Sequence, residues 1–546
     1  MLIKNNIHTM TGARVITNTL KLLETDTIFG YPGGMVLDVY DELYNQDSIK
    51  HILVRHEQSA VHAAEGYARV SGKCGVVLVT SGPGATNTVT GIVNAYLDGY
   101  PIIVLAGQVE KHLIGKNSFQ EANICEITKT CTKAVFRVTD ANDIRNTLCE
   151  AYKIAMSGKK GPVVIEMSKN IYKQNVQFDE EIKIDIKSKS NQSGVNIKYL
   201  YDKILSSSRP VVVVGGGVNH SNAHEELYEF VHRFNLPFVS TMMGLGSFKS
   251  SDDNYIGMLG IFGDNRANQV IRESDLVISL GARFNDRITC MFENDELLNK
   301  IIQVDINPYE VSNNIKPIYS LCTDIKYILN SLNIINNIQN GHKYTDWLHC
   351  TKKYITNNKS PKKQSNMLHS FEIFNKLEAY TKNMPVIFTS EVGQHQLWAV
   401  KGLKFDIARK ILLSGGSGTM GFGLPAAIGA AIAAPDKAIV CICGDGSLQM
   451  SLGELSVCKD YGLNIKILVL NNGYLGMVRQ LQEKNFNRHY SNTQISNPDF
   501  VKLSDSFGID AIKVNCINKV ENALHKAFST DKTYVIDFEI EPMEIL

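Results

Sequence analysis

The chain has 546 residues, of which 44% are hydrophobic and 20% are charged, as is usual for a globular protein with large cores. Its formal net charge of +1 provides no positive excess for a polyanion, so we expect neither a nucleic acid nor a membrane as a partner. The eleven cysteines include no C-x-x-C pair, and "MLIKNNIHTMTGARV" has no apolar stretch resembling a signal peptide. These features predict a cytoplasmic protein with reduced thiols.

Three segments alternate short apolar runs with helix-like patterns, which predicts an α/β fold. The first, residues 9–175, contains "TDTIFGYP", "GVVLVTSGPG", "PIIVLAGQ" and "GPVVIEM". The second, residues 194–337, contains "RPVVVVGGG", "DLVISLGARF" and "IIQVDIN", and the third, residues 370–546, contains "MPVIFTSEVG", "AIVCICGDG", "IKILVLNNG" and "YVIDFEI". Polar stretches near 187–194 and between 336 and 366 are predicted linkers. The pattern therefore predicts three doubly wound parallel-sheet domains.

In the first segment, "HILVRHEQSAVHAAEGYARVSGK" places Glu57 where a strand gives way to a helix. A carboxylate at this position is most often present because it interacts favourably with the helix dipole. The alternative is catalytic: the aminopyrimidine ring of thiamine diphosphate must share a proton with a carboxylate. Taken alone, the stretch around Glu57 favours the dipole interpretation.

In the second segment, "PVVVVGGGVNHSNA" places Gly215, Gly216 and Gly217 directly after a strand. This is weak evidence for a nucleotide site, because a triple glycine otherwise marks a tight turn. His220 occupies the third glycine place of G-x-G-x-x-G. An NAD-dependent oxidoreductase is disfavoured for that reason.

In the third segment, the apolar runs 438–443 and 465–470 read as buried parallel strands, with a helical pattern between them that ends at Gly462. Asp445 and Asn472 then follow neighbouring strands at the carboxyl edge of one sheet, where such folds bind ligands. A Gly-Asp-Gly triplet alone is more often a turn. With "NNGYLG" behind the second strand, the pattern favours a divalent cation that holds a diphosphate.

Several motifs together resemble the catalytic large subunits of acetolactate synthase (acetohydroxyacid synthase), which are thiamine diphosphate-dependent enzymes. They are "FGYPGG", "RHEQSAVHAAEGYAR", "TSGPGATN", "EVGQHQLWA", "SGGSGTMGFGLPAAIGA" and "GDGSLQM", followed by "NNGYLGMVRQ". The resemblance extends from about residue 9 to residue 541, nearly the whole chain. "YPGG", "FQE" and "GQHQLWA" point to this branch of the superfamily.

The resemblance implies a reaction of branched-chain (isoleucine and valine) amino acid biosynthesis. Pyruvate is decarboxylated on thiamine diphosphate, and the hydroxyethyl group is ligated to a second 2-keto acid, either pyruvate or 2-ketobutyrate. It also implies a homodimer or homotetramer in which the cofactor lies between the first segment of one subunit and the third of another. A small regulatory subunit is a further possible partner. The alternatives are a related carboligase or decarboxylase with a different acceptor, and a degraded homologue without catalytic activity.

The same resemblance assigns site residues. Glu57 would face the pyrimidine ring, while Asp445, Asn472 and the main-chain carbonyl of Tyr474 would bind Mg²⁺. The substrate pocket would be lined by Phe119 and Gln120. The remaining thiamine diphosphate candidates are Pro32, Gly33, Gly393, Gln394, His395, Gly418, Met420, Gly446, Ser447, Leu475, Gly476 and Met477. The candidates for a non-redox, structural FAD are Lys159, Gly215, Gly216, Gly217, Met258, Gly281, Ala282, Arg283, Arg287 and Asp305.

The chain departs from the family pattern around the expected substrate channel. The departures there are Met35, Glu110, Phe262 and Leu481, the last standing where the family has tryptophan. Loss of an indole removes a large flat contact surface, so we expect a weakened preference for 2-ketobutyrate or a different acceptor. At the FAD site, Asn285 is a further departure, and Lys159 or Lys160 replaces an arginine. Lysine lacks the bidentate fork of arginine, so a weaker hold on FAD is expected.

Overall fold

We analysed a computed structural model that describes residues 7–179, 196–292, 297, 299–335, 343–354, 365–407 and 410–546. The predicted linker near 187–194 lies outside the described residues, as do 336–342 and 355–364 of the second linker. Within the described ranges, no helix is both long and apolar enough to span a lipid bilayer.

Three six-stranded sheets, each entirely parallel, confirm the predicted α/β class. The N-terminal sheet has the order β3-β2-β4-β5-β7-β6 and consists of β2 (Thr27–Tyr31), β3 (Lys50–Leu53), β4 (Gly75–Val79), β5 (Ile102–Gln108), β6 (Ala134–Val138) and β7 (Pro162–Ser168). Its flanking helices include α1 (Gly12–Leu22), α2 (Leu37–Tyr44), α3 (Glu57–Ser71), α5 (Val89–Asp98) and α7 (Ile144–Met156). A separate antiparallel ribbon joins β1 (Ile7–Thr11) to β8 (Asn175–Asp179). We call this part the N-terminal unit.

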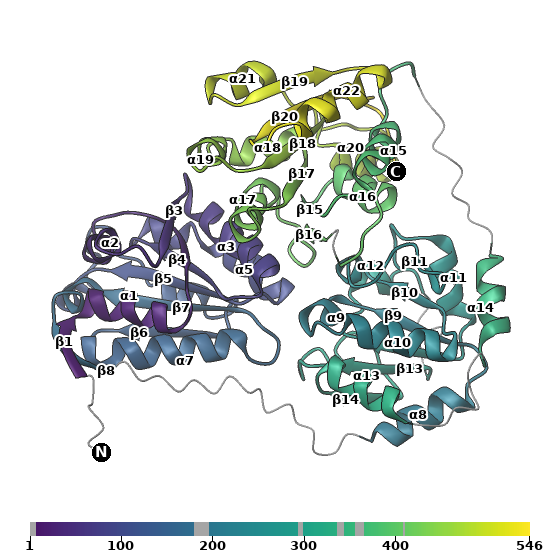
Figure 1. Cartoon of the computed structure of the whole chain (residues 1–546), viewed down its shortest axis with the longest axis horizontal. Coiled ribbons are helices and arrows are strands. Elements are labelled where there is room, and N and C mark those ends of the chain that lie inside the picture. Colours follow the sequence, from purple (N-terminus) through teal and green to yellow (C-terminus); the bar gives the residue numbers. More distant parts are fainter. Residues whose placement is uncertain are drawn as a thin grey trace.

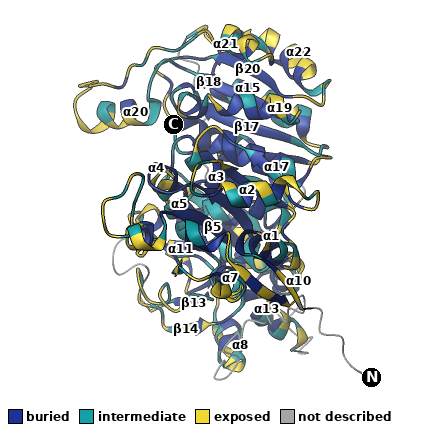
Figure 2. Cartoon of the chain, turned by 90° about the vertical axis from the view of Figure 1, so that its left-hand side faces the viewer, coloured by how far each residue is buried: buried dark blue, intermediate teal, exposed yellow. Residues whose placement is uncertain are grey.

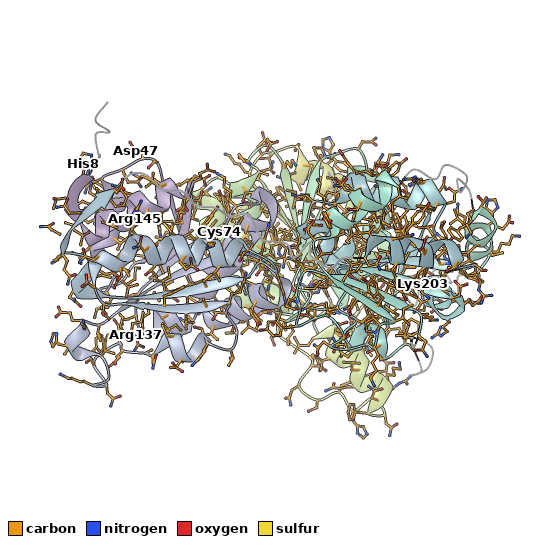
Figure 3. All side chains as sticks on the ribbon, turned by 90° about the horizontal axis from the view of Figure 1, so that it is seen from below. His8, Asp47, Cys74, Arg137, Arg145 and Lys203 are labelled. Carbon is orange, nitrogen blue, oxygen red and sulfur yellow. The ribbon has the colours of Figure 1, made fainter. Side chains whose placement is uncertain are left out.

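The central unit is built on the order β11-β10-β9-β12-β13-β14. Its strands are β9 (Pro210–Val214), β10 (Phe238–Ser240), β11 (Tyr255–Met258), β12 (Leu276–Leu280), β13 (Ile301–Asp305) and β14 (Tyr319–Cys322). Its helices include α8 (Ile197–Ser206), α9 (Gly216–His220), α10 (His224–Phe234), α11 (Asn265–Glu273) and α13 (Ile325–Ile334). In Figure 3 this unit, which carries Lys203, lies opposite the N-terminal unit with Arg137 and Arg145.

The C-terminal unit has the order β16-β15-β17-β18-β20-β19. Its strands are β15 (Val386–Ser390), β16 (Ile411–Leu413), β17 (Ala438–Gly444), β18 (Ile465–Asn471), β19 (Asp510–Val514) and β20 (Tyr534–Glu539). Its helices include α15 (Ser370–Thr381), α16 (Gln394–Gly402), α17 (Gly423–Ala433), α20 (Gly476–Asn485), α21 (Phe500–Ser506) and α22 (Ile517–Phe528). Figure 2 shows the buried strands inside this unit and the exposed surface of α20, which projects from the body.

Helices α3 and α17 join the N-terminal and C-terminal units, as Figure 1 shows. Two glycines let their backbones approach: a Cβ on Gly66 would lie 2.2 Å from the carbonyl oxygen of Ala426, and one on Gly429 would lie 1.8 Å from that of Ala63. Side chains from both sheets meet in one hydrophobic core around this contact. The edges of the two sheets are therefore placed by a direct helix–helix contact rather than by a linker.

The connection between β17 and β18 differs from the single helix that the sequence predicts. It contains α18 (Asp445–Leu448), a 3₁₀ turn (Gln449–Ser451) and α19 (Glu454–Asp460). Gly462 lies just beyond α19 with a φ of 59°, while Tyr461 is the capping residue. The apolar spacing correctly indicates a buried face, but it does not reveal that the chain turns into a helix at Asp445 itself.

All eleven cysteines lie within the described residues and are free thiols, as predicted. Cys74, labelled in Figure 3, is buried, and burial raises the pKa of its thiol to about 12.

Candidate active site

Asp445 and Asn472 come together at the carboxyl edge of the C-terminal sheet, where the adjacent strands β17 and β18 end. The Asp445 side chain is buried, and its Oδ2 accepts hydrogen bonds from the Gly473 amide (2.8 Å) and from Asn497 Nδ2 (2.6 Å). Asn472 Oδ1 accepts a hydrogen bond from the Tyr474 amide at 3.0 Å. Burial raises the pKa of the Asp445 carboxyl. One buried carboxylate and one amide oxygen, both hard ligands, thus lie at the same edge of the sheet, which suits Mg²⁺.

Asn497 is a site residue that sequence reasoning missed. Its Nδ2 donates to both Asp445 and Asn471 (2.8 Å), so it orients the carboxylate from a segment that belongs to no motif. No local signal in "ISNPDF" could have identified it, because the contact exists only after the chain returns to this edge.

Two helices begin beside this edge of the sheet. Gln394 is the first residue of α16 and Gly476 is the first residue of α20. A Cβ on Gly476 would lie 2.0 Å from Gln394 Oε1, so a side chain there would require the Gln394 side chain to move. Asn472 Nδ2 lies 3.4 Å from the same oxygen. Helix starts of this kind favour a phosphate group, which fits the diphosphate of the predicted cofactor.

His395, the second residue of α16, has a ring nitrogen without a hydrogen-bond partner in the described structure. This nitrogen, Nε2, is buried. It lies 4.0 Å from Glu391 Oε1, and burial lowers the pKa of the imidazole to about 4. Gly393 leaves room for this ring, because a Cβ there would be 2.4 Å from His395 Cε1. An orphaned nitrogen of a neutral imidazole fits a ligand that this chain itself does not provide.

Glu391 is another residue that the sequence reasoning did not select. Its carboxyl is fully enclosed and accepts a hydrogen bond from the Gly423 amide. Burial raises the pKa of Glu391 from its ordinary 4.5 to about 7. The stability that this group contributes is therefore fully present below about pH 4.5 and is lost as the pH rises through about 7.

We expect Glu391→Gln to remove this pH dependence. Between pH 4.5 and 7 the free energy of unfolding of the cofactor-free wild type should fall by up to about 1.4 kcal/mol per pH unit because of this group. The variant should lack that contribution and be the more stable protein at pH 8. Urea unfolding at several pH values tests this, with the exposed Glu521→Gln as control. Equal pH profiles for wild type and Glu391→Gln would contradict the assignment.

The N-terminal candidates gather at the carboxyl edge of their own sheet. Glu57, half-buried, is the first residue of α3, and its Oε2 accepts a hydrogen bond from Asn87 Nδ2 at 2.9 Å. A Cβ on Gly84 would lie 3.4 Å from Glu57 Oε1. Asn87 and Gly84 lie in "TSGPGATN", so the two motifs of this unit meet in space.

The segment before Glu57 is held by the C-terminal unit. Glu454 on α19 accepts hydrogen bonds from the Arg55 amide at 3.1 and 3.3 Å. The His56 ring nitrogen Nδ1 accepts from the Gln58 amide at 3.1 Å and caps α3. The start of α3 is thereby held by the C-terminal unit through Glu454 and by its own cap through His56.

The other N-terminal candidates surround the same loops. Gly33 and Gly84 both face Thr80, and Gly82 packs against the backbone of Gln120. Gln120 has a φ of 58°, and Phe119 beside it is 84% exposed; Pro32 is also exposed. Among the described residues, no hydrogen bond or ion pair joins this group to Asp445, Asn472 or Gln394 of the same chain. Within a single chain these candidates thus form two groups, which we call the N-terminal and C-terminal half-sites.

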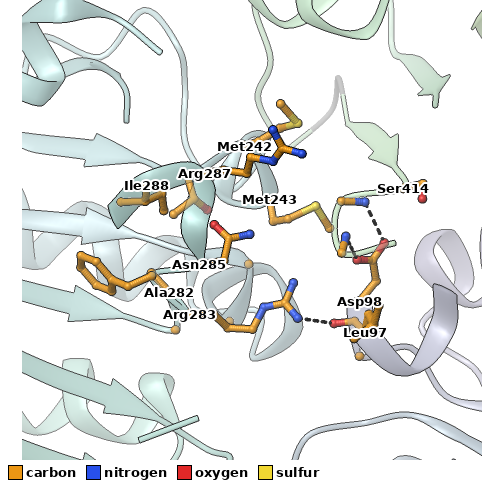
Figure 4. Close-up of a pocket in the computed structure, with 18 of the residues that line it drawn as sticks. Leu97, Asp98, Met242, Met243, Ala282, Arg283, Asn285, Arg287, Ile288 and Ser414 are labelled. Atoms are coloured by element: carbon orange, nitrogen blue, oxygen red, sulfur yellow. Dashed lines mark hydrogen bonds between the residues drawn. The ribbon is translucent and has the colours of Figure 1, made fainter. Parts of the chain in front are cut away.

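A cavity of about 580 Å³ lies where the three units meet, at the carboxyl ends of the central strands. Figure 4 shows part of its wall. Most of the FAD candidates line it: Lys159, Gly216, Gly217, Met258, Gly281, Ala282, Arg283, Arg287 and Asp305. Three thiamine diphosphate candidates also line it: Gly393, Gly418 and Met477. Gly215 is not among the lining residues; it precedes α9, where a Cβ would be 2.1 Å from the carbonyl oxygen of Gly281.

The triple glycine thus forms the close-packed start of a short helix, with Gly215 before it and Gly216 and Gly217 as its first residues. His220, at the end of that helix, is half-buried and packs against Tyr100 with ring centroids 4.6 Å apart. Its Nε2 lies 3.0 Å from the carbonyl oxygen of Asp98. This histidine therefore joins the central unit to the N-terminal unit.

The wall of the cavity carries both basic and acidic side chains. Lys159 Nζ lies 3.3 Å from Glu310 Oε1, and burial lowers the pKa of Lys160. Gln396, which sequence reasoning missed, lines the cavity and has a buried Nε2 without a partner in the described structure. A free amide donor in a cavity wall is expected to meet an acceptor on the ligand.

Some of the residues that depart from the family pattern line the cavity, and others lie on loops of the N-terminal unit. Phe262, Asn285 and Leu481 line the cavity. Met35 and Glu110 lie outside its lining, on loops of the N-terminal unit: the Met35 amide is 3.4 Å from Thr80 Oγ1, and Glu110 pairs with His112 at 3.4 Å. Phe262 and Leu481 thus line this cavity and Met35 and Glu110 do not, and the expectation that these four side chains surround the substrate channel stays a prediction.

Three family models match the chain. Residues 10–127 match the N-terminal TPP binding domain of thiamine pyrophosphate enzymes, residues 197–332 match their central domain, and residues 391–538 match their C-terminal TPP binding domain.

Curated relatives extend over nearly the whole chain. The acetolactate synthase large subunit of Haemophilus influenzae is 38% identical over 98% of this chain and 95% of its own length. The corresponding protein of Lactococcus lactis is 36% identical over 98% of this chain and 93% of its own length. The acetolactate synthase isozyme 3 large subunit of Escherichia coli is 37% identical over 95% of this chain and 92% of its own length. The chain thus belongs to the thiamine pyrophosphate enzymes and, among them, to the family of acetolactate synthase large subunits.

Proposed function

We propose that this chain is a catalytic subunit that converts pyruvate and a second 2-keto acid into an acetohydroxyacid and CO₂. The observation that carries the proposal is the meeting of Asp445, Asn472 and Gln394 where two strands end and two helices begin. Thiamine diphosphate, when bound, supplies the reactive thiazolium carbon and the electron sink that allows CO₂ to leave. The chain's own residues would bind it, orient it and move its proton.

The C-terminal unit would hold the diphosphate through Mg²⁺. Asp445, Asn472 and the carbonyl oxygen of Tyr474 would be the protein ligands, with phosphate oxygens and water completing the shell. Asn497 would keep the Asp445 carboxylate in position. Direct contacts to the cofactor are proposed for Gly393, Gln394, His395, Gly418, Met420, Gly446, Ser447, Leu475, Gly476 and Met477.

The N-terminal unit would supply the acid–base group. Glu57 would exchange a proton with the pyrimidine ring, and Asn87 would orient its carboxylate. Pro32 and Gly33 would form the wall beside the ring, and Phe119 and Gln120 would contact the substrate.

The two half-sites support a homodimer or homotetramer. The N-terminal half-site of one subunit would face the C-terminal half-site of the next, so each site would need both chains. The 84% exposure of Phe119 in the single chain agrees with a side chain that a partner subunit covers. A small regulatory subunit is a further proposed partner.

The cavity would hold FAD in a structural role. Arg283 and Arg287 would meet its charged groups, and Gln396 would donate to it. Asp305, Met258 and the glycines of the central unit would line its binding site. With the domain limits proposed at 9–175, 194–337 and 370–546, the flavin would lie at the junction of all three domains.

We expect Leu481→Trp to shift acceptor choice toward 2-ketobutyrate. Leu481 is 45% exposed and lines the cavity beside Met477, so an indole there adds a flat surface without displacing the core. The additional methylene group of 2-ketobutyrate against this surface contributes about 0.8 kcal/mol, or roughly a fourfold change in product ratio. Val478→Trp on the same helix is the control, because Val478 is exposed outside the cavity lining. The measurement is competition between pyruvate and 2-ketobutyrate, and an unchanged ratio would contradict the expectation.

The function itself is tested by pyruvate turnover of the purified chain with thiamine diphosphate, Mg²⁺ and FAD. CO₂ release and acetolactate formation are followed separately. Matching rates would support the proposal, whereas CO₂ without acetolactate would indicate a different acceptor or a decarboxylase. If neither product forms although thiamine diphosphate binds, the proposed catalytic role of the chain alone is wrong, and addition of a small regulatory subunit is then tested.

A further inference from the structure

One loop of the C-terminal unit, residues 414–419, depends on two side chains of the N-terminal unit. Asp98 and Asn94 lie one turn apart on α5. The two Asp98 carboxylate oxygens accept hydrogen bonds from the amides of Gly415 (3.1 Å) and Gly416 (2.7 Å). Figure 4 shows Asp98 in these two contacts, next to Ser414. The carboxylate therefore clamps two consecutive peptide units of the loop.

Asn94 holds the two ends of the same loop. Its Oδ1 accepts from the hydroxyl groups of Ser414 (2.5 Å) and Thr419 (3.1 Å). The Thr419 amide in turn donates to Ser414 Oγ at 2.7 Å. These side chains are buried, so their hydrogen bonds do not compete with bulk water.

A charged network holds the clamp from behind. Arg69 donates to Asp98 Oδ2 at 2.7 Å and also pairs with Glu65, and these side chains are almost completely buried. Glu65 accepts from Asn94 Nδ2 at 2.8 Å. The guanidinium group of Arg69 lies 4.0 Å from the ring centre of Tyr100. Because every oxygen of Asp98 has a donor, the carboxylate is rigid and satisfied.

The same end of α5 also contacts the central unit. Arg283 donates to the carbonyl oxygen of Leu97 at 2.8 Å, as Figure 4 shows. A Cβ on Gly416 would lie 3.0 Å from Asp98 Oδ1 and 3.3 Å from an Arg283 nitrogen. The loop thus passes between an acid and a base that belong to two other units, and residues 414–418 form part of the cavity wall.

We propose that Asp98 is a positioning residue that sets the shape of loop 414–419 and, through it, the affinity of the cavity for FAD. This inference rests on the proposed function, because FAD is the ligand used to read it. An electrostatic role and a positioning role of Asp98 would change the affinity for FAD in opposite directions when the charge is removed. Loss of a negative charge beside an anionic dinucleotide should strengthen binding because Coulomb repulsion falls, whereas loss of the clamp should weaken binding.

The test is Asp98→Asn in the full chain, with FAD as the probe and flavin fluorescence as the readout. An asparagine provides one acceptor oxygen for two amides, and its NH₂ group would face a backbone N–H or Arg69. We expect at least a tenfold rise in the dissociation constant for FAD and faster hydrogen exchange at Gly415 and Gly416. Ser414→Ala removes the side-chain hydrogen bonds of the same loop to Asn94 and from the Thr419 amide without disturbing a buried charge, and should change both readouts in the same direction.

Glu166→Gln is the matched control. Glu166 is a fully buried carboxylate of the same unit, paired with Arg137, which Figure 3 places away from the central unit. It lies outside the cavity lining. Its replacement should lower stability without changing FAD affinity or exchange in loop 414–419.

The outcomes distinguish failure of the FAD assignment from failure of the positioning role of Asp98. If wild type binds FAD and Asp98→Asn binds it equally well or better, the positioning role is wrong. If wild type does not bind FAD, the flavin assignment fails, and hydrogen exchange alone decides about Asp98. Equal exchange of Gly415 and Gly416 in Asp98→Asn, Ser414→Ala and Glu166→Gln would then overturn the inference.

Discussion

Glu57→Gln is expected to lower kcat for acetolactate formation by about 10²- to 10⁴-fold, the range found for loss of a positioned acid–base group. The amide has nearly the same shape as the carboxylate and can still accept the hydrogen bond from Asn87. It cannot take up and return a proton at the pyrimidine ring. Binding of thiamine diphosphate, measured by near-UV circular dichroism, should change far less than turnover.

The control must separate catalysis from the helix-dipole interpretation of Glu57. Glu372 lies in the first turn of α15, and its carboxylate accepts a hydrogen bond from the His369 amide at 3.0 Å. Glu372→Gln should therefore cost a comparable amount of helix stability, about 0.3–1 kcal/mol, without loss of turnover. If both variants lose activity equally, or if Glu57→Gln stays fully active, the catalytic role of Glu57 is excluded.

Asp445→Asn should raise the Mg²⁺ concentration needed for half-maximal activity by about 100-fold or more, since even residues that only orient metal ligands contribute 10- to 100-fold. Asp445 is the only carboxylate among the three proposed ligands. The asparagine removes its charge and places an NH₂ group near the Asn497 Nδ2 that now donates to the carboxylate. Activity and thiamine diphosphate binding are titrated against Mg²⁺.

Asp537→Asn provides a control from β20, the strand that pairs with β18 in the same sheet. Asp537 on β20 is buried, its carboxyl pKa is raised by burial as in Asp445, and it accepts from Asn471 Nδ2 at 3.0 Å. Its replacement should leave the Mg²⁺ requirement unchanged. The same Mg²⁺ shift in both variants would mean that a general disturbance of this edge, and not a metal contact, causes the effect.

The sequence alone was sufficient for the fold class and for the proximity of Asp445 and Asn472. Buried parallel strands are nearly continuous apolar runs, so "AIVCIC" and "IKILVL" could be recognised locally. Because parallel strands end at the same edge, the proximity of Asp445 and Asn472 follows from their positions after those runs. The family motifs then identified Glu57, for which the local pattern alone favoured a helix-start carboxylate.

The tertiary structure alone decided which groups are buried, orphaned or clamped. Asn497 belongs to no motif, and Glu391 and Gln396 stand in "EVGQHQLWA", which does not reveal their surroundings. Each acquires its role through burial or a contact with distant segments. Asp98 reads as an ordinary helix-end residue in "NAYLDGYP", yet its carboxylate holds a loop more than three hundred residues away in the chain. Periodicity encodes which side of an element is apolar, whereas the partner of a buried polar group depends on how the three units pack together.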